Sequence, residues 1–124
     1  MTAFDPGALL SRSYALPRGP RVRLRLARSA DGAAIAALAA EHGVDLDPLA
    51  LARLLRFDRR RLVICAMALI GAEEVFAGFG AIDLEPGARP GLVLVDQELT
   101  DGLGELLAAA LAGRAAAIAR FRAA

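Results

Sequence analysis

The chain has 124 residues, 56% of them hydrophobic, and a formal net charge of +1. A chain of this length forms one domain whose core can fold without disulfides or a structural metal. The near-neutral charge argues against a dedicated nucleic-acid binder, and a single histidine with a single cysteine argues against a zinc site. One cysteine gives no disulfide framework within the chain, so a reducing, cytoplasmic location is expected.

No segment has the pattern of a membrane span or a signal peptide. The longest uncharged apolar run, residues 62–72, is far shorter than the ~18 residues that a spanning helix needs. The N-terminus has no basic segment followed by an apolar stretch. We expect no membrane contact, a flexible lead-in over residues 1–11, and a single domain over residues 12–124.

The first predicted element is a β-hairpin. Residues 13–16 can form a short strand, and the Pro-Arg-Gly-Pro segment at 17–20 is typical of a turn. Arginines and apolar residues then alternate from Arg21 to Leu26, which predicts a strand with Val22, Leu24 and Leu26 on its buried face. The opposite, arginine-bearing face is expected to be solvated.

Two short helices are predicted next. Ser29 is a favourable N-cap for the first, which we expect to end at Gly43. Asp47 and Pro48 are typical of the cap and first position of a second helix, which the apolar pattern carries to near Phe57.

Two further strands and a turn follow. Residues 62–70 predict a buried strand in which Cys65 is an inert thiol, and residues 71–74 predict a turn. The return strand over residues 75–84 contains Gly78 and Gly80, which indicate a bulge or a close backbone approach.

The last part of the chain predicts one strand and one helix. Residues 92–95 are all apolar, so we expect a strand that is buried on both faces. Residues 105–119 predict an alanine-rich helix, and residues 120–122 could begin another strand. The predicted fold class is α/β (α+β), with a mixed, mainly antiparallel sheet and helices on both faces.

The junction between this strand and the final helix is the strongest functional signal from the residues. Gly102 and Gly104 precede the helix, where free backbone N–H groups and the positive end of the helix dipole favour a phosphate. Glycine lets a ligand approach the backbone closely. The same pattern is also typical of a tight turn that packs a helix against a sheet, so both interpretations stay open.

The order of elements resembles that of the GCN5-related N-acetyltransferases. Residues 21–25 followed by 29–31 look like the opening strand and first-helix cap of that family, and residues 75–82 are similar to its third strand with a glycine in the middle. Residues 94–96 through 102–104 align without gaps onto its fourth strand and acetyl-CoA loop. Residues 114–121 look like its third helix and the approach to its fifth strand.

The resemblance implies that the chain binds acetyl-CoA and transfers the acetyl group to an amine of a small molecule or a protein without a covalent enzyme intermediate. The protein would supply positioning, a base and oxyanion stabilisation. The implied cofactor-binding groups belong to the fourth strand and the loop after it: Val93, Leu94, Val95, Thr100, Asp101, Gly102, Leu103 and Gly104.

The candidate catalytic bases are acidic residues at strand ends, namely Asp83, Glu85 and Asp96. Each is also typical of a solvated strand end. His42 lies in the loop between the two predicted helices, which lines the acceptor side in the family.

An alternative function is a catalytically inactive module that senses acyl-CoA or pairs with a partner. Leu99 stands where the family carries Gln or Arg, and Asp101 stands where a basic residue is common. A purely structural domain is a third interpretation. The sequence stops where the family's fifth strand would begin, so we expect a homodimer or a partner chain to cover the edge of residues 92–95.

Overall fold

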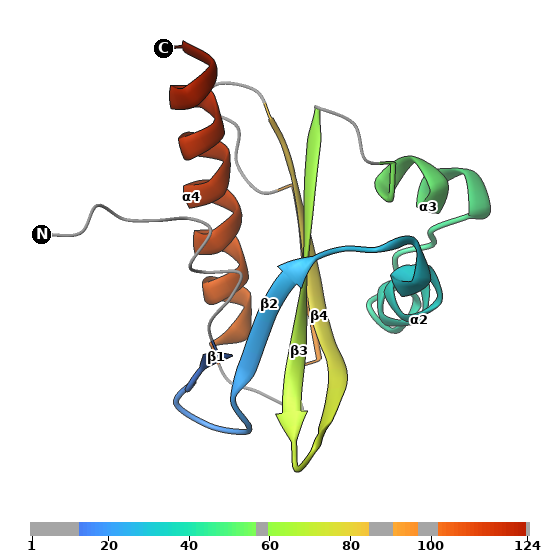
Figure 1. Cartoon of the computed structure of the whole chain (residues 1–124). Coiled ribbons are helices and arrows are strands. Elements are labelled where there is room, and N and C mark those ends of the chain that lie inside the picture. The colour runs from blue at the N-terminus through green and yellow to red at the C-terminus, as the bar shows by residue number, and fades with distance from the viewer. Residues whose placement is uncertain (1–12, 57–59, 85–90, 97–101, 124) are drawn as a thin grey trace, which may run out of the picture.

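The computed structural model describes residues 13–56, 60–84, 91–96 and 102–123 (Figure 1). The strands form one five-stranded sheet in the order β1-β2-β3-β4-β5, and each neighbouring pair is antiparallel. The elements are β1 (Ser13–Tyr14), β2 (Val22–Leu26), η1 (Ser29–Asp31), α2 (Gly32–Glu41), α3 (Pro48–Leu54), β3 (Arg61–Ile70), β4 (Glu73–Asp83), β5 (Leu92–Val95) and α4 (Leu103–Ala123).

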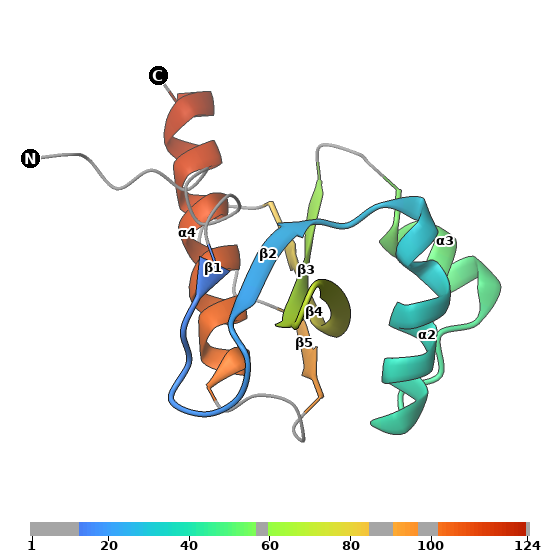
Figure 2. The same ribbon diagram turned by 60° about the horizontal axis from the view of Figure 1, so that its bottom comes forward.

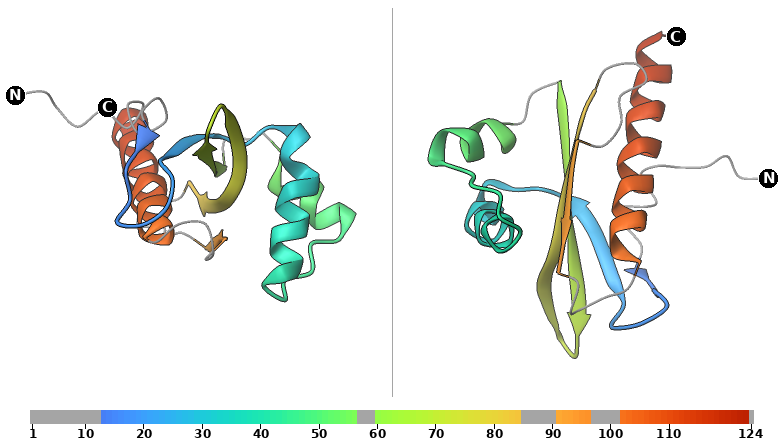
Figure 3. Two further views of the ribbon diagram at one scale, coloured as in Figure 1. Left: turned by 90° about the horizontal axis from the view of Figure 1, so that it is seen from below. Right: turned by 180° about the vertical axis from the view of Figure 1, so that it is seen from behind.

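The sheet is covered on both faces. Helix α4 lies against one face, and α2 and α3 lie against the other (Figures 1 and 3). Two buried clusters fill these layers: one joins α4 to β2, β3 and β4, and the other joins α2 and α3 to the opposite side of β3 and β4. The expected fold class is confirmed: an α+β fold with helices on both faces of the sheet. The described strands pair only in antiparallel fashion, so the mixed character expected of the sheet is not found among them.

The predicted N-terminal hairpin is present, with Tyr14 beside Val22. Val22 and Leu24 are fully buried under α4, as the alternating pattern predicts. Leu26, expected on the same buried face, is instead 42% exposed. It is the last residue of β2, where the chain leaves the sheet for η1.

The start of the first helix differs from the prediction. Ser29 is not an N-cap, because residues 29–31 form a 3-10 turn and α2 begins at Gly32. The carboxylate of Asp31 accepts a hydrogen bond from the backbone N–H of Arg28 at 2.6 Å, so Asp31 ties this turn together.

The other helix boundaries follow the sequence signals more closely. Gly43 follows the end of α2 with φ +73°, a conformation that favours glycine. Asp47 caps α3 by accepting from the backbone N–H of Ala50 at 2.7 Å, and Pro48 is its first residue. Helix α3 ends at Leu54, before the predicted end at Phe57, which lies outside the described residues.

Strand β4 is curved (Figure 2), and it contains the bulge and the close backbone approaches that its two interior glycines predict. The register shifts between Ala66 and Met67, so that Ala77 is an extra residue on β4. A Cβ atom on Gly78 would lie 2.8 Å from the carbonyl oxygen of Leu94, and one on Gly80 would lie 2.6 Å from Leu111 Cδ1. The glycines therefore let β5 and α4 approach β4.

The last two elements correct two predictions. The residues of β5 are half-buried rather than buried, because β5 is the edge strand of the described sheet. Residues 120–122 belong to α4 and do not begin a strand. Alanine and arginine have high helix propensity, which favours continuing the helix through this segment. Among the described residues, no helix combines the length and hydropathy that crossing a bilayer requires.

The close approach at Gly78 predicts that Gly78→Ala lowers the free energy of unfolding by about 1–3 kcal/mol, because its Cβ meets backbone atoms that cannot rotate away. Gly104→Ala is the matched control. A Cβ there meets no atom within 4 Å, so we expect unchanged stability or a gain of up to about 1 kcal/mol. Urea unfolding measures both, and equal midpoints for the two variants would contradict the predicted clash.

Candidate functional site

The candidate site begins at the outer edge of β5. One side of this strand pairs with β4, from Ala81 beside Leu92 to Gly78 beside Val95. No strand pairs with its other side within the part of the chain that the structure describes. An open strand edge presents backbone N–H and C=O groups that can bind an extended ligand or another strand.

The hydrogen bonds to β4 show which backbone groups face this open edge. Asp96 N–H donates to the carbonyl of Ala77 at 2.8 Å, and the carbonyl oxygen of Leu94 lies against Gly78. Pairing alternates along an antiparallel strand, so the N–H and C=O groups of Val93 and Val95 point away from β4. The backbone of Leu94 points toward β4.

His42 contacts one of these outward-facing groups. Its Nε2 lies 2.9 Å from the carbonyl oxygen of Val95, so the ring donates this hydrogen bond. His42 is exposed and caps the C-terminal end of α2, the helix that lies with α3 against one face of the sheet. The two residues are 53 positions apart. The sequence places His42 in a loop, but only the fold brings it to this edge.

The two glycines at the junction with α4 have different roles. Gly102 has φ +83°, so it makes the turn that enters the helix. The side chain of Leu103 is 1% exposed and belongs to the core under the sheet. At Gly104 a Cβ would meet nothing within 4 Å, so this backbone borders open space in the first turn of α4. Thr100 and Asp101 lie outside the described residues.

The expected cofactor-binding set is therefore only partly available in the described residues. The backbone groups of Val93 and the N–H of Val95 face away from β4, and Gly104 borders open space, as a ligand site requires. The carbonyl of Val95 also faces outward but accepts from His42. Leu94 and Leu103 have structural roles instead. The backbone of Leu94 pairs with β4, and the side chain of Leu103 is part of the core.

The candidate bases do not meet. Asp96 lies beside Ala77, whereas Asp83 ends the same strand, β4, roughly 20 Å farther along. Glu85 lies outside the described residues. Asp83 and Asp96 therefore occupy opposite ends of β5 and cannot act on the same atom.

A small pocket lies at the Asp83 end. It has a volume of about 230 Å³ and is lined by Leu54, Arg61, Ala81, Asp83, Gly91 and Leu92. Arg61 and Asp83 are cross-strand partners, with Arg61 Nε donating to Asp83 Oδ1 at 3.1 Å. Arg61 is not among the predicted site residues, and the sequence pattern does not pair it with Asp83, although the predicted turn near residues 71–74 makes the two strands antiparallel neighbours.

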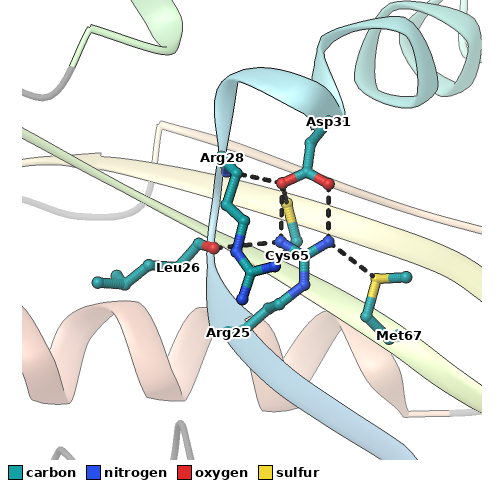
Figure 4. Close-up of polar contacts among 6 residues, drawn as sticks. All are labelled: Arg25, Leu26, Arg28, Asp31, Cys65 and Met67. Atoms are coloured by element: carbon teal, nitrogen blue, oxygen red, sulfur yellow. Dashed lines mark hydrogen bonds and ion pairs between the residues drawn. The ribbon is translucent and has the colours of Figure 1, made fainter. Parts of the chain in front are cut away.

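The described residues whose proton affinities are shifted lie elsewhere, in a buried cluster around Asp31 (Figure 4). The carboxylate of Asp31 is held by Arg25 through two bonds of 2.7 Å, and Cys65 Sγ lies 3.8 Å from Oδ2. Arg25 was expected on a solvated strand face. It instead bends under η1, where it also contacts Met67 Sδ at 3.7 Å.

This cluster has altered proton affinities with clear causes. The hydrogen bonds from Arg25 hold the pKa of Asp31 below its ordinary value of 3.8, although burial opposes them. Burial and the charge of Asp31 raise the pKa of the Cys65 thiol to about 12. Cys65 is thus a buried neutral thiol, which agrees with its expected inert role.

The Asp31 cluster is a structural clamp between β2, η1 and β3. Its carboxylate oxygens already accept hydrogen bonds from Arg25 and Arg28, and both side chains of the ion pair are largely enclosed. Within the described residues, no group of His, Cys, Asp and Glu side chains could hold a metal ion.

The chain matches no model of a known protein family, no curated protein and no solved structure.

The Asp31 clamp predicts a pH-dependent stability. The carboxylate titrates below its ordinary value, so its contribution is complete at neutral pH. The contribution is lost as the pH falls below about 4. Asp31→Asn should lower the free energy of unfolding by about 3 kcal/mol at pH 7 and flatten its dependence on pH below 4. Urea unfolding at several pH values measures this.

Glu74→Gln is the control, because it breaks the exposed ion pair between Arg23 and Glu74. We expect it to change stability by less than about 1 kcal/mol. An Asp31→Asn variant with the stability and acid dependence of this control would contradict the clamp.

Proposed function

We propose that the chain is an acetyl-CoA-dependent N-acetyltransferase-like protein that transfers acetyl to an amine. The observation that carries the proposal is the outer edge of β5, where the backbone groups of Val93 and Val95 point away from β4 and no further strand pairs within the described residues. The carbonyl of Val95 already accepts a hydrogen bond from His42 there. The amides of a pantetheine arm can bind such an edge as an added strand would. Backbone N–H groups at the start of α4 suit the phosphates.

The order and pairing of the elements support this function. A strand, two helices, three antiparallel strands and a helix follow one another, which is the element order in which the sequence resembles the GCN5-related N-acetyltransferases. In the reaction, the amine nitrogen attacks the thioester carbonyl, the C–N bond forms and the C–S bond breaks. The proton lost by the amine balances the released thiolate. A reducing, cytoplasmic compartment suits the single free thiol of the chain.

The alternative is an acyl-CoA-binding or partner-binding module without catalysis. It is favoured by the separation of Asp83 and Asp96, because the two carboxylates lie at opposite ends of β5 and do not form one cluster. A second copy of the chain that paired with β5 would use the same groups of Val93 and Val95. Such a homodimer and acyl-CoA would therefore compete, and titrations at two protein concentrations distinguish the two occupants.

Gly104→Glu should weaken acetyl-CoA binding by about tenfold or more, because it places a carboxylate beside the site proposed for the phosphates. The fold has room for a side chain at this position, and an acid in the first turn of a helix is favourable. Calorimetric titration with acetyl-CoA measures the effect, and Gly104→Ala is the control of neutral charge.

The titration also separates the hypotheses. Binding with acetyl transfer to amines supports the enzyme, and binding without transfer supports the sensing module. The absence of binding at millimolar acetyl-CoA would exclude both.

His42→Ala should strengthen acetyl-CoA binding. The ring donates to the carbonyl of Val95, so a ligand amide that binds this carbonyl must displace it. A net hydrogen-bond contribution of about 0.5–1.5 kcal/mol corresponds to a gain of roughly two- to tenfold in affinity. Glu41→Ala, at the neighbouring exposed position, is the control. Weaker binding by His42→Ala would contradict this prediction, because it would show that the ring contacts the bound ligand rather than occupying the strand edge only in the free protein.

A further inference from the structure

The pocket at the start of β5 has a chemical character that the proposed acetyl-CoA site does not use. Its lining includes the apolar residues Leu54, Ala81 and Leu92, which come from α3, β4 and β5. Its volume of about 230 Å³ is below the ~300–1,000 Å³ of pockets that take drug-sized molecules. It therefore suits a ligand with few heavy atoms and a short apolar group.

Two opposite charges also line this pocket. Arg61 and Asp83 form an ion pair at 3.1 Å, with side chains 39% and 61% exposed. An ion pair this exposed is weak, and the single bond between Arg61 Nε and Asp83 Oδ1 leaves the guanidinium further donors and the carboxylate a second acceptor oxygen. Both charges can therefore accept a further partner without separating from each other.

We propose that this pocket binds a small zwitterion of the α-amino acid type. The ammonium of the ligand pairs with Asp83, its carboxylate pairs with Arg61, and its side chain contacts the apolar wall. Both ligand charges sit on one carbon, so they are about as close together as the charges of the Arg61–Asp83 pair. The four groups then alternate in sign.

The pairing also explains why a zwitterion is favoured over an ion of single charge. A simple amine would be attracted by Asp83 but repelled by Arg61 beside it. A simple carboxylate would be attracted by Arg61 but repelled by Asp83. The ladder between β3 and β4 fixes this arrangement, because Arg61 and Asp83 are cross-strand partners and Leu84 N–H donates to the carbonyl of Arg60 at 2.7 Å.

The position of the pocket gives the ligand a role. Leu92 lines the pocket and is also the first residue of β5, so the pocket adjoins the strand edge proposed for acyl-CoA. A bound α-amino acid would be the acetyl acceptor. This role rests on the proposed acyl transfer, whereas binding of the zwitterion does not.

The test uses the full chain without acyl-CoA and three probes of matched shape. These are L-valine, isobutylamine, which lacks the carboxylate, and isovalerate, which lacks the ammonium. Binding is followed by chemical-shift changes in the amide spectrum at up to millimolar concentrations of each probe. We expect L-valine to bind about threefold or more tightly than either single-charge probe, with the largest shifts at Ala81, Asp83 and Leu92.

Charge variants give a pattern that a mere change in folding would not produce. Asp83→Asn should weaken L-valine binding by about threefold or more and strengthen isovalerate binding, because Arg61 loses its competing carboxylate. Arg61→Gln should likewise weaken the binding of L-valine and strengthen the binding of isobutylamine. Arg23→Gln removes the other exposed strand ion pair and should change none of these affinities.

Equal affinity for all three probes, no binding of L-valine, or the same L-valine affinity in both pocket variants as in the unaltered chain would overturn the proposal. Titration with acetyl-CoA is a separate measurement. Binding of L-valine without binding of acetyl-CoA would support the amino-acid pocket and contradict the proposed acyl transfer. Binding of acetyl-CoA without binding of L-valine would support the cofactor site and contradict the amino-acid pocket.

Discussion

The arrangement of the sheet depends on close contact between the middle of β4 and two neighbouring elements. Gly78 and Gly80 have no side chains, so the backbone of β5 and the side chain of Leu111 on α4 occupy the space where Cβ atoms would be. This contact sets β5 against β4 and holds α4 over the same strand. Interiors pack too densely to absorb an added carbon at such a point without movement.

The proposed function follows from this placement of β5. The side chains of Val93 and Val95 pack toward the α4 cluster, and those of Leu92 and Leu94 pack toward the α2/α3 cluster. Within the described residues, the backbone between them pairs with a strand on one side only. His42 is held at one end of that edge, and the Arg61–Asp83 pocket lies at the other. A single four-residue strand thus connects the proposed cofactor groups to the proposed acceptor pocket.

Local patterns predicted most of the fold but few of the contacts at the site. Alternation located β2, Asp47 and Pro48 marked α3, and the glycines of β4 indicated the close approach, because each signal depends on neighbouring residues. The pairs Arg25–Asp31 and His42–Val95 depend on how helices pack against the sheet, which periodicity does not specify. Residues 120–122, which the sequence pattern allows to begin a strand, continue α4 instead, because three residues give a weak strand signal beside a long helix of alanine and arginine.

Amide hydrogen exchange at β5, with and without acetyl-CoA, tests the central claim most directly. The amide of Leu94 faces β4 and should be protected in both states, whereas those of Val93 and Val95 should exchange rapidly in the free protein and become protected when acetyl-CoA binds. Val93 and Val95 amides that stay unprotected at saturating acetyl-CoA would contradict an acyl-CoA site at this edge.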